Sequence, residues 1–282
     1  MQSHSPLSHS ALTPHTQLTR PRGEQPTEEE KAKYIVKGPY AWRHRGIGNE
    51  QPLIGLVRDT AIWLVAEQLL GKGALIEPTL GAPWRADRSA GQQSERVRGV
   101  ICNLPRPPHP HPDSVRRPIA NGAHVDSQPF HCGVVVLVGD CPPGGGSFTI
   151  FPRSHMRLYE ADRRFGDVAA SYNPPPSGSG GFIEELQPVY QQVQAEVKAE
   201  VPHLEFHGHA GDVLFWHSRM FHAQSANHSW PPQIRQAVIH DLALKVIDDP
   251  DRALRHDELM ADPWLECELS SSCRRFHSTQ EG

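Results

Sequence analysis

The sequence of 282 residues predicts a mainly β protein with flanking helices, folded as a double-sheet jelly roll. Two observations indicate this fold class. Short segments typical of strands alternate with Gly- and Pro-rich turns in the second half of the chain. The segments of helical character gather near the N-terminal side and in a single insertion between strands, which is typical of a sheet protein with helices on its outside.

The first structured segments are expected to be a helix and a strand. Residues 58–70 consist mostly of good helix formers and are followed by Gly71, which predicts a helix that ends at a glycine C-cap. Residues 96–104 have the composition of a strand. Residues 106–118 are rich in Pro and His, and this composition predicts a loop.

The strand pattern becomes dense from residue 130 onward. Residues 130–138 are rich in β-branched side chains, which predicts a buried strand. A Pro- and Gly-rich turn at 141–146 separates this strand from a short alternating strand at 147–151.

An insertion at 157–200 interrupts the strands. It contains a Pro/Ser/Gly loop at 174–181 and leads into a predicted helix at 182–201. The β pattern then resumes, with predicted strands at 204–207, 212–217 and 235–243.

The composition of the two ends predicts tails around one folded domain. Residues 1–32 are rich in Ser, Pro, Thr, His and Gln, and they have too few large apolar side chains to offset the entropy of ordering. Residues 269–282 have a similar character. The sequence therefore predicts a disordered N-terminal tail at 1–32, one domain at 33–268 and a flexible C-terminal tail at 269–282.

The bulk composition argues against several classes of partner. The formal net charge is -4, so neither nucleic acid nor an anionic membrane is an expected partner. No apolar run approaches the roughly 20 residues that span a bilayer, and we identify no secretory signal or peroxisomal tail. The 5 cysteines lack C-x-x-C spacing and fit a reducing compartment, so we expect a cytoplasmic protein. The sequence leaves the oligomeric state open.

A possible pair of metal ligands precedes the dense strand region. His124 and Asp126 are two residues apart, so both would point to the same side of an extended segment. His222, far downstream, could add a third ligand on one face of an octahedron and leave the opposite face open. Two imidazoles and a carboxylate without a thiolate suit Fe(II) better than Zn or Mg. An H-x-D triplet alone is weak evidence in a chain with 18 histidines.

His217 is an alternative to His222 as the third ligand. It lies five residues earlier and would face elsewhere on a short strand, so we favour His222. Trp216 is expected to be a core aromatic residue rather than a platform for substrate. Three further histidines are expected to line the barrel or stabilise strands: His131, His207 and His209.

Three segments resemble the phytanoyl-CoA dioxygenase family. They are 123–126 followed by the Val-rich strand, 144–155, and 211–227 with Arg235 beyond it. The resemblance extends over roughly residues 55–245 and is strongest in these segments. Members of the family are Fe(II)- and 2-oxoglutarate-dependent oxygenases built on a double-stranded β-helix, a cupin-like jelly roll. The resemblance implies that fold and that activity here, with O2 as the second cosubstrate.

The resemblance also implies roles for individual residues. His124, Asp126 and His222 match the family's iron ligands. Arg235 matches the arginine that binds the far carboxylate of 2-oxoglutarate, and a guanidinium suits this role because it donates two parallel hydrogen bonds to a carboxylate. Two neighbours could either bind the cosubstrate or satisfy loop backbone: Gln224 and Asn227.

The chain departs from the family pattern in two places. The family's Pro-Gly-Ser-His turn is present at 152–155 with Arg153 in place of the glycine, which puts the local turn geometry in question but not the ligands. The segment between His222 and Arg235 is also long, and Trp230-Pro231-Pro232 are expected to form an inserted loop.

The implied function is hydroxylation, or another oxidation, of a small organic substrate with release of succinate and CO2. Because Asp126 is present, the related halogenases, which lack this carboxylate, fit less well. Two alternatives stay open: a catalytically silent jelly-roll metal-binding protein with a binding or regulatory role, and a cupin-like enzyme of another class. Arg235 argues against the latter, since such an enzyme needs no buried carboxylate anchor. The loops at 106–118 and 174–181 are either a lid or solvated connectors.

Overall fold

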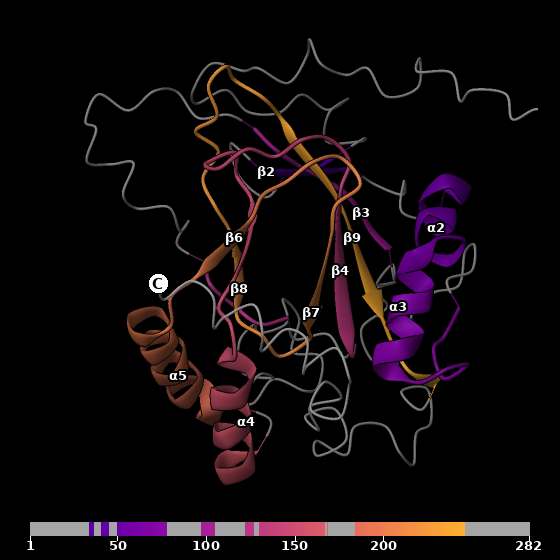
Figure 1. Ribbon diagram of the computed structural model, residues 1–282. Helices are drawn as coiled ribbons and strands as arrows, with labels where there is room; N and C mark the ends of the chain where they lie inside the picture. Colours follow the sequence, from indigo (N-terminus) through magenta and orange to yellow (C-terminus); the bar gives the residue numbers. More distant parts are fainter. Residues whose placement is uncertain are drawn as a thin grey trace, which may run out of the picture.

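The computed structural model describes residues 34–36, 41–44, 50–77, 97–104, 122–126, 130–166, 168 and 184–245. Within these ranges, two antiparallel sheets face each other and four α-helices lie outside them (Figure 1). The predicted tails at 1–32 and 269–282 and the predicted loops at 106–118 and 174–181 lie outside the described residues. None of the helices in the described ranges has the length and apolar character that crossing a membrane requires.

The larger sheet has six strands in the order β1-β2-β3-β9-β4-β7. Neighbouring strands are antiparallel throughout, and β9 is hydrogen-bonded to both β3 and β4. The predicted strands at 96–104, 130–138, 212–217 and 235–243 are confirmed as β3, β4, β7 and β9. The strands are β1 (Tyr34–Val36), β2 (Ala41–His44), β3 (Val97–Asn103), β9 (Arg235–Leu242), β4 (Cys132–Leu137) and β7 (Val213–His217).

The smaller sheet consists of β6 (Leu204–Phe206), β5 (Phe148–Ile150) and β8 (His222–Gln224), in that order. Its β5 and β6 confirm the strands predicted at 147–151 and 204–207. An antiparallel bridge joins His222 of β8 to His124, so the segment around His124 extends this sheet beyond β8. The sheet thus places the two histidines, far apart in the sequence, on neighbouring extended segments.

One apolar cluster fills the space between the two sheets. The larger sheet contributes inward-facing residues of β4, β7 and β9, and the smaller sheet contributes Phe148 with Ile150 and Phe206 packed beside it. Alternation along each strand produces this arrangement, since every second side chain points to the same face. The buried members of the cluster are Phe130, Val135, Leu137, Cys141, Phe148, Trp216, Ala237 and Ile239.

Two helices, α2 (Gln51–Arg58) and α3 (Ala61–Leu70), cover the outer face of the larger sheet. The prediction of one helix at 58–70 was therefore wrong at its start, because the chain breaks between two helices. The Thr60 side chain accepts a hydrogen bond from the amide of Ile62 at 3.2 Å, which makes it the N-cap of α3. The predicted C-cap is confirmed at Gly71, which has φ of 105°.

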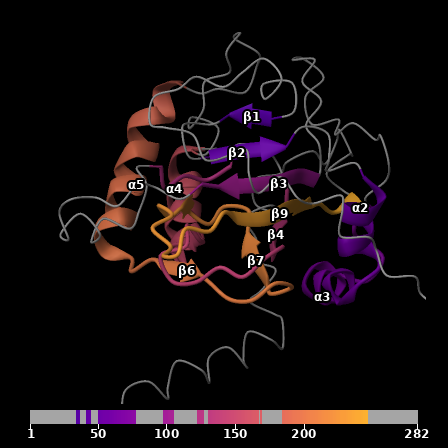
Figure 2. The same cartoon turned by 90° about the horizontal axis from the view of Figure 1, so that it is seen from above.

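The other two helices, α4 (Ser154–Phe165) and α5 (Gln187–Glu200), cover the outer face of the smaller sheet. Figures 1 and 2 both show them on the opposite side of the sheets from α2 and α3. The helix predicted at 182–201 is confirmed as α5 preceded by a 3-10 turn at Glu184–Leu186. Helix α4 was not predicted.

The turn before α4 places Arg153 in a backbone conformation that favours glycine. Arg153 adopts φ of 62° and ψ of 5°, the left-handed conformation that glycine adopts most easily. It is the only non-glycine residue with positive φ among the described residues. An arginine therefore occupies a turn conformation that favours glycine, and α4 begins at the next residue, Ser154.

Gly133 gives the large Trp216 side chain room against β4. A Cβ atom built on Gly133 would lie 2.1 Å from Cζ2 of Trp216, a distance that carbon atoms do not adopt. Trp216 is 1% exposed and belongs to the closely packed cluster between the sheets. The close approach of backbone and indole therefore requires glycine at this position.

Gly133→Ala is expected to lower the free energy of unfolding by about 2 kcal/mol or more, because the added methyl group overpacks the core. Urea unfolding measures this loss. Gly139→Ala is the matched control, since a Cβ at Gly139 meets nothing within 4 Å. Equal losses in the two variants would contradict the packing argument.

His131 is buried immediately before β4, where its imidazole contacts the backbone of the segment that follows β9. Its Nδ1 accepts a hydrogen bond from the amide of Leu244 at 3.2 Å. Burial lowers the pKa of His131 from 6.5 to about 4. The folded protein therefore keeps this imidazole neutral at pH values at which the unfolded chain protonates it.

The contribution of His131 to stability is complete above pH 6.5 and is expected to fall as the pH drops toward 4, since the unfolded state then binds the extra proton. The full loss is about 3 kcal/mol. Urea unfolding of the wild type and of His131→Asn, compared at pH 7.5 and 5, measures this contribution. A pH dependence that is equally steep in both proteins would contradict it.

Candidate metal centre

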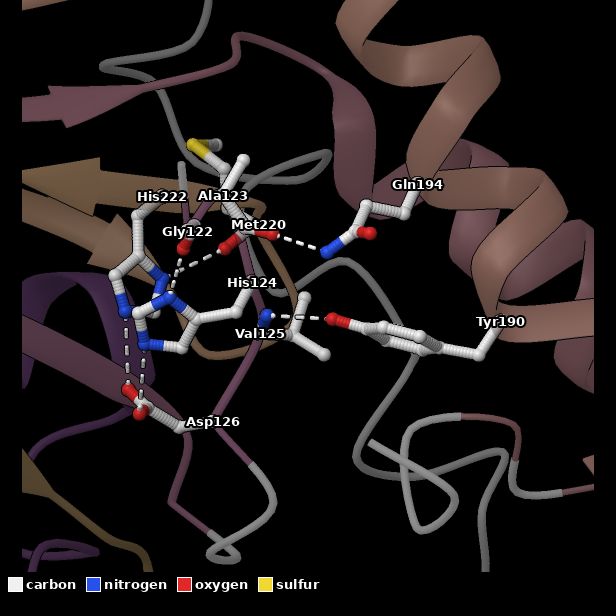
Figure 3. A network of polar contacts seen from close by, with 9 residues as sticks. All are labelled: Gly122, Ala123, His124, Val125, Asp126, Tyr190, Gln194, Met220 and His222. Carbon is white, nitrogen blue, oxygen red and sulfur yellow. Dashed lines mark hydrogen bonds and ion pairs between the residues drawn. The ribbon is translucent and has the colours of Figure 1, made fainter. Parts of the chain in front are cut away.

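Three side chains converge where the segment around His124 meets β8. The Nε2 atom of His124 lies 3.9 Å from Oδ1 of Asp126, and Nε2 of His222 lies 3.3 Å from Oδ2 of the same carboxylate (Figure 3). The three donor atoms all lie within 4.8 Å of one another. Adjacent ligands of an octahedral ion with bonds of about 2.1 Å are about 3 Å apart. A small inward movement of the side chains would therefore produce metal-ligand spacing.

Backbone carbonyl groups orient both imidazole rings. The Nδ1 atom of His124 lies 2.5 Å from the carbonyl oxygen of Gly122, and Nδ1 of His222 lies 3.1 Å from that of Met220. A carbonyl oxygen only accepts hydrogen bonds, so each Nδ1 carries the proton and donates it. The Nε2 atom of each ring faces Asp126 and is the atom that would bind a metal ion.

The backbone sets the distance between the two histidines. The amide of His124 donates to the carbonyl of His222 at 2.9 Å, and the amide of His222 donates to the carbonyl of His124 at 2.8 Å. The ring centroids of the two residues are 4.5 Å apart. The side chains differ in exposure, at 5% for His222, 12% for Asp126 and 30% for His124. The centre therefore opens to solvent on the side of His124.

Aromatic side chains form the inner wall behind His222. The ring of Phe148 stacks on His222 with centroids 5.3 Å apart, and the Trp216 ring lies 5.9 Å away. Trp216 belongs to the core between the sheets, so its expected role as a core aromatic residue is confirmed. Its Nε1 is buried without a hydrogen-bond partner among the described residues. This wall excludes water from one side of the centre.

Arg235 is a buried cation at the start of β9. It is 3% exposed, and its Nε donates to the carbonyl of Gly146 at 2.8 Å. Its Nη1 is buried and has no hydrogen-bond partner in the described part of the chain, and no acidic side chain there pairs with it. Burial lowers the pKa of Arg235 to about 10, which leaves it charged at neutral pH. A buried guanidinium with no acidic partner among the described residues is suited to an anionic ligand.

Gln224 and Asn227 have different surroundings. Gln224 lies two residues after His222 on β8 and therefore points to the same face of the smaller sheet, opposite Phe148 in the register. Asn227 donates from Nδ2 to the carbonyls of Asn103 and Gln233, and its Oδ1 accepts from the amide and hydroxyl of Ser229. These four hydrogen bonds fill its capacity and support the second of its two expected roles, that of satisfying loop backbone.

The rival ligand His217 lies outside the cluster. It is 2% exposed, its ring stacks on His155 of α4 at 4.8 Å, and its Nδ1 accepts from the amide of Arg219. The preference for His222 over His217 thus agrees with the geometry. His207 is exposed, and the side chain of His209 is 87% exposed next to Asp140.

The sequence did not predict the residues that contact the backbone next to the candidate ligands. Helix α5 contributes Tyr190 and Gln194, which contact the backbone on either side of His124 (Figure 3). The helix was predicted, but a hydrogen bond between residues 65 positions apart leaves no pattern in the sequence. Phe148 was likewise predicted only as part of a strand.

The arrangement defines a candidate mononuclear centre for a divalent ion. Two imidazoles and one carboxylate on one side leave further coordination positions for other ligands, and the donor set fits Fe(II). The buried charge of Arg235 fits a cosubstrate that carries a carboxylate. These features define the class of protein as one with two facing sheets and a candidate site for a divalent metal ion on strand residues.

The comparison with protein families agrees with this class. Residues 66–237, more than half of the chain, match the family described as phytanoyl-CoA dioxygenase (PhyH). The chain belongs to this family, whose members use Fe(II) and 2-oxoglutarate. The resemblance seen in the sequence is therefore confirmed.

Several solved structures resemble this chain weakly. HygX from Streptomyces hygroscopicus, with nickel and 2-oxoglutarate bound, is 11% identical over 75% of this chain and 73% of its own, with a TM-score of 0.40. The carbocyclase SnoK from nogalamycin biosynthesis, described as non-heme and alpha-ketoglutarate-dependent, is 20% identical over 52% and 49%, with a TM-score of 0.33. AviO1 from Streptomyces viridochromogenes Tue57 is 15% identical over 53% and 51%, with a TM-score of 0.30.

The matched region spans about half the length of SnoK and AviO1. These identities and scores are too low to transfer any property of the three proteins to this chain. A comparison with curated proteins finds no match.

Proposed function

We propose that this protein is an Fe(II)- and 2-oxoglutarate-dependent dioxygenase that hydroxylates, or otherwise oxidises, a small organic substrate. The convergence of His124, Asp126 and His222 is the observation that carries the proposal. Two imidazoles and one carboxylate on a single face are the ligand set of non-haem Fe(II) oxygenases. Membership of the phytanoyl-CoA dioxygenase family supports the same conclusion.

We assign the domain at 33–268 to the double-stranded β-helix class. Two antiparallel sheets face each other across one core, and the ligands lie on adjacent extended segments of the smaller sheet. This is the arrangement that a jelly roll provides, with the metal held by strand residues rather than by a flexible loop.

Arg235 is the proposed anchor for the far carboxylate of 2-oxoglutarate. The carbonyl that it contacts belongs to Gly146, two residues before Phe148, whose ring lies against His222. Gln224 faces the same side as His222 and is the proposed neighbour of the cosubstrate. We assign Asn227 to the support of the loop that precedes β9, because its hydrogen bonds are filled by protein groups.

When bound, Fe(II) and 2-oxoglutarate supply the oxidising chemistry with O2, and succinate and CO2 are released. The chain's own residues hold and orient these groups. His222 and Phe148 form a dry side, while the partly exposed His124 marks the side from which a substrate approaches. The carboxylate of Asp126 occupies the position that a halide would need, which favours oxidation over halogenation.

Asp126→Ala is expected to weaken Co(II) or anaerobic Fe(II) binding by more than about 100-fold, because the only anionic ligand is lost. Titration of the metal-free protein measures the affinity, and circular dichroism checks that the fold persists. Asp59→Ala changes an exposed carboxylate next to α2 and serves as the control. Unchanged metal affinity in Asp126→Ala would refute the ligand assignment.

Arg235→Leu is expected to raise the 2-oxoglutarate concentration needed for half-saturation by about 100- to 1000-fold, roughly 3–4 kcal/mol, since a buried bidentate charge pair is lost. Metal affinity is expected to stay the same. Arg235→Lys keeps the charge but not the planar fork, and an intermediate value is expected.

Succinate formation from 2-oxoglutarate, with or without coupled substrate oxidation, decides between an enzyme and a silent metal-binding protein. A metal-loaded wild type that binds no 2-oxoglutarate and releases no succinate would overturn the proposed function. A 2-oxoglutarate requirement unchanged in Arg235→Leu would mean that another residue is the anchor.

A further inference from the structure

Among the described residues, the segment that carries His124 is the outermost segment of the smaller sheet, next to β8. His124 directs its amide and carbonyl toward His222 on β8. The neighbouring residues of an extended segment direct theirs the opposite way, so the carbonyl of Ala123 and the amide of Val125 point away from the sheet. Both residues are 0% exposed, which means that these two backbone groups need partners other than water.

Helix α5 supplies both partners with side chains. The hydroxyl of Tyr190 accepts a hydrogen bond from the amide of Val125 at 3.2 Å, and Nε2 of Gln194 donates to the carbonyl of Ala123 (Figure 3). Residues four apart on a helix lie on one face, separated by about 6 Å along the axis. Two residues of a strand span about 6.6 Å. The distance between Tyr190 and Gln194 along the helix therefore matches the distance between Ala123 and Val125 along the extended segment.

Helices α4 and α5 also contact the chain next to His222. The ring of Tyr190 packs against Phe221 with centroids 5.7 Å apart, and the hydroxyl of Ser154 at the start of α4 accepts from the amide of Phe221 at 2.9 Å. Each histidine ligand is thus adjacent to a residue held from outside by the insertion helices. His124 depends most on this support, because it is the more exposed ligand and lies at the edge of the sheet.

We infer that Tyr190 and Gln194 are positioning residues that set the metal affinity of the centre by fixing the backbone on both sides of His124. This inference rests on the proposed metal site. It means that α5, the helix in the insertion, controls part of the metal affinity. Without the two hydrogen bonds, the edge segment can move away from β8, and Nε2 of His124 no longer holds its place beside Asp126. The ring of Tyr190 has a separate packing role, so its hydroxyl can be tested alone.

The test is titration of the metal-free protein with Co(II), read from the visible spectrum of the bound ion, for wild type, Tyr190→Phe, Gln194→Leu and the double variant. Each single variant is expected to bind Co(II) about 10-fold more weakly, as is typical when a group that orients a ligand is removed. The double variant is expected to lose more and to show a changed Co(II) spectrum. Hydrogen exchange of the amides at 123–126 is expected to be faster in the metal-free variants.

Gln192→Leu is the matched control, because Gln192 lies on the exposed side of α5 and pairs only with Glu196 in the described structure. It should retain the wild-type Co(II) affinity. If only the unfolding midpoint changes in the double variant, while its Co(II) affinity stays within twofold of wild type, Tyr190 and Gln194 are structural and the inference is wrong. If the wild type itself binds no Co(II), the proposed metal site fails first, and the inference falls with it.

Discussion

The reciprocal backbone hydrogen bonds between His124 and His222 are the constraint on which the rest of the centre depends. They fix two residues that are far apart in the sequence as neighbours, and the side chains of such a pair point to one face of the sheet. Asp126 then joins them because it follows His124 by two residues. The ligand set is thus a product of strand register, and a slip by one residue would turn His222 away from the other two.

Burial of Arg235 places a positive charge inside the fold, and this has an energetic cost. Among the described residues, its Nε donates to the carbonyl of Gly146 and no acidic side chain pairs with the guanidinium, so the cost is compensated only in part there. As the proposed anchor of the cosubstrate, Arg235 would present a charge that is already oriented before a carboxylate binds.

Most of the strands leave local patterns in the sequence, but β1, β2 and β8 were not predicted. His222, which β8 carries, was assigned as a candidate ligand through the family resemblance. Alternation and β-branched runs mark β4, β5 and β7, and the H-x-D triplet places two donors on one side of an extended segment. Helix α4 was not predicted because no side chain caps its start. Leu158 and Ala161 of this helix pack in the cluster on the outside of the smaller sheet, and such packing leaves no local signal in the sequence. The hydrogen bonds of Tyr190 and Gln194 could not be predicted, since they depend on where a distant helix docks.

The unequal exposure of the two imidazoles gives the centre a direction. His222 lies against Phe148 and Trp216 in the dry core, whereas His124 stands at the boundary with solvent. A metal ion held here would therefore have one shielded imidazole, that of His222, and one imidazole within reach of water, that of His124. Small molecules from solvent would approach such an ion from the side of His124.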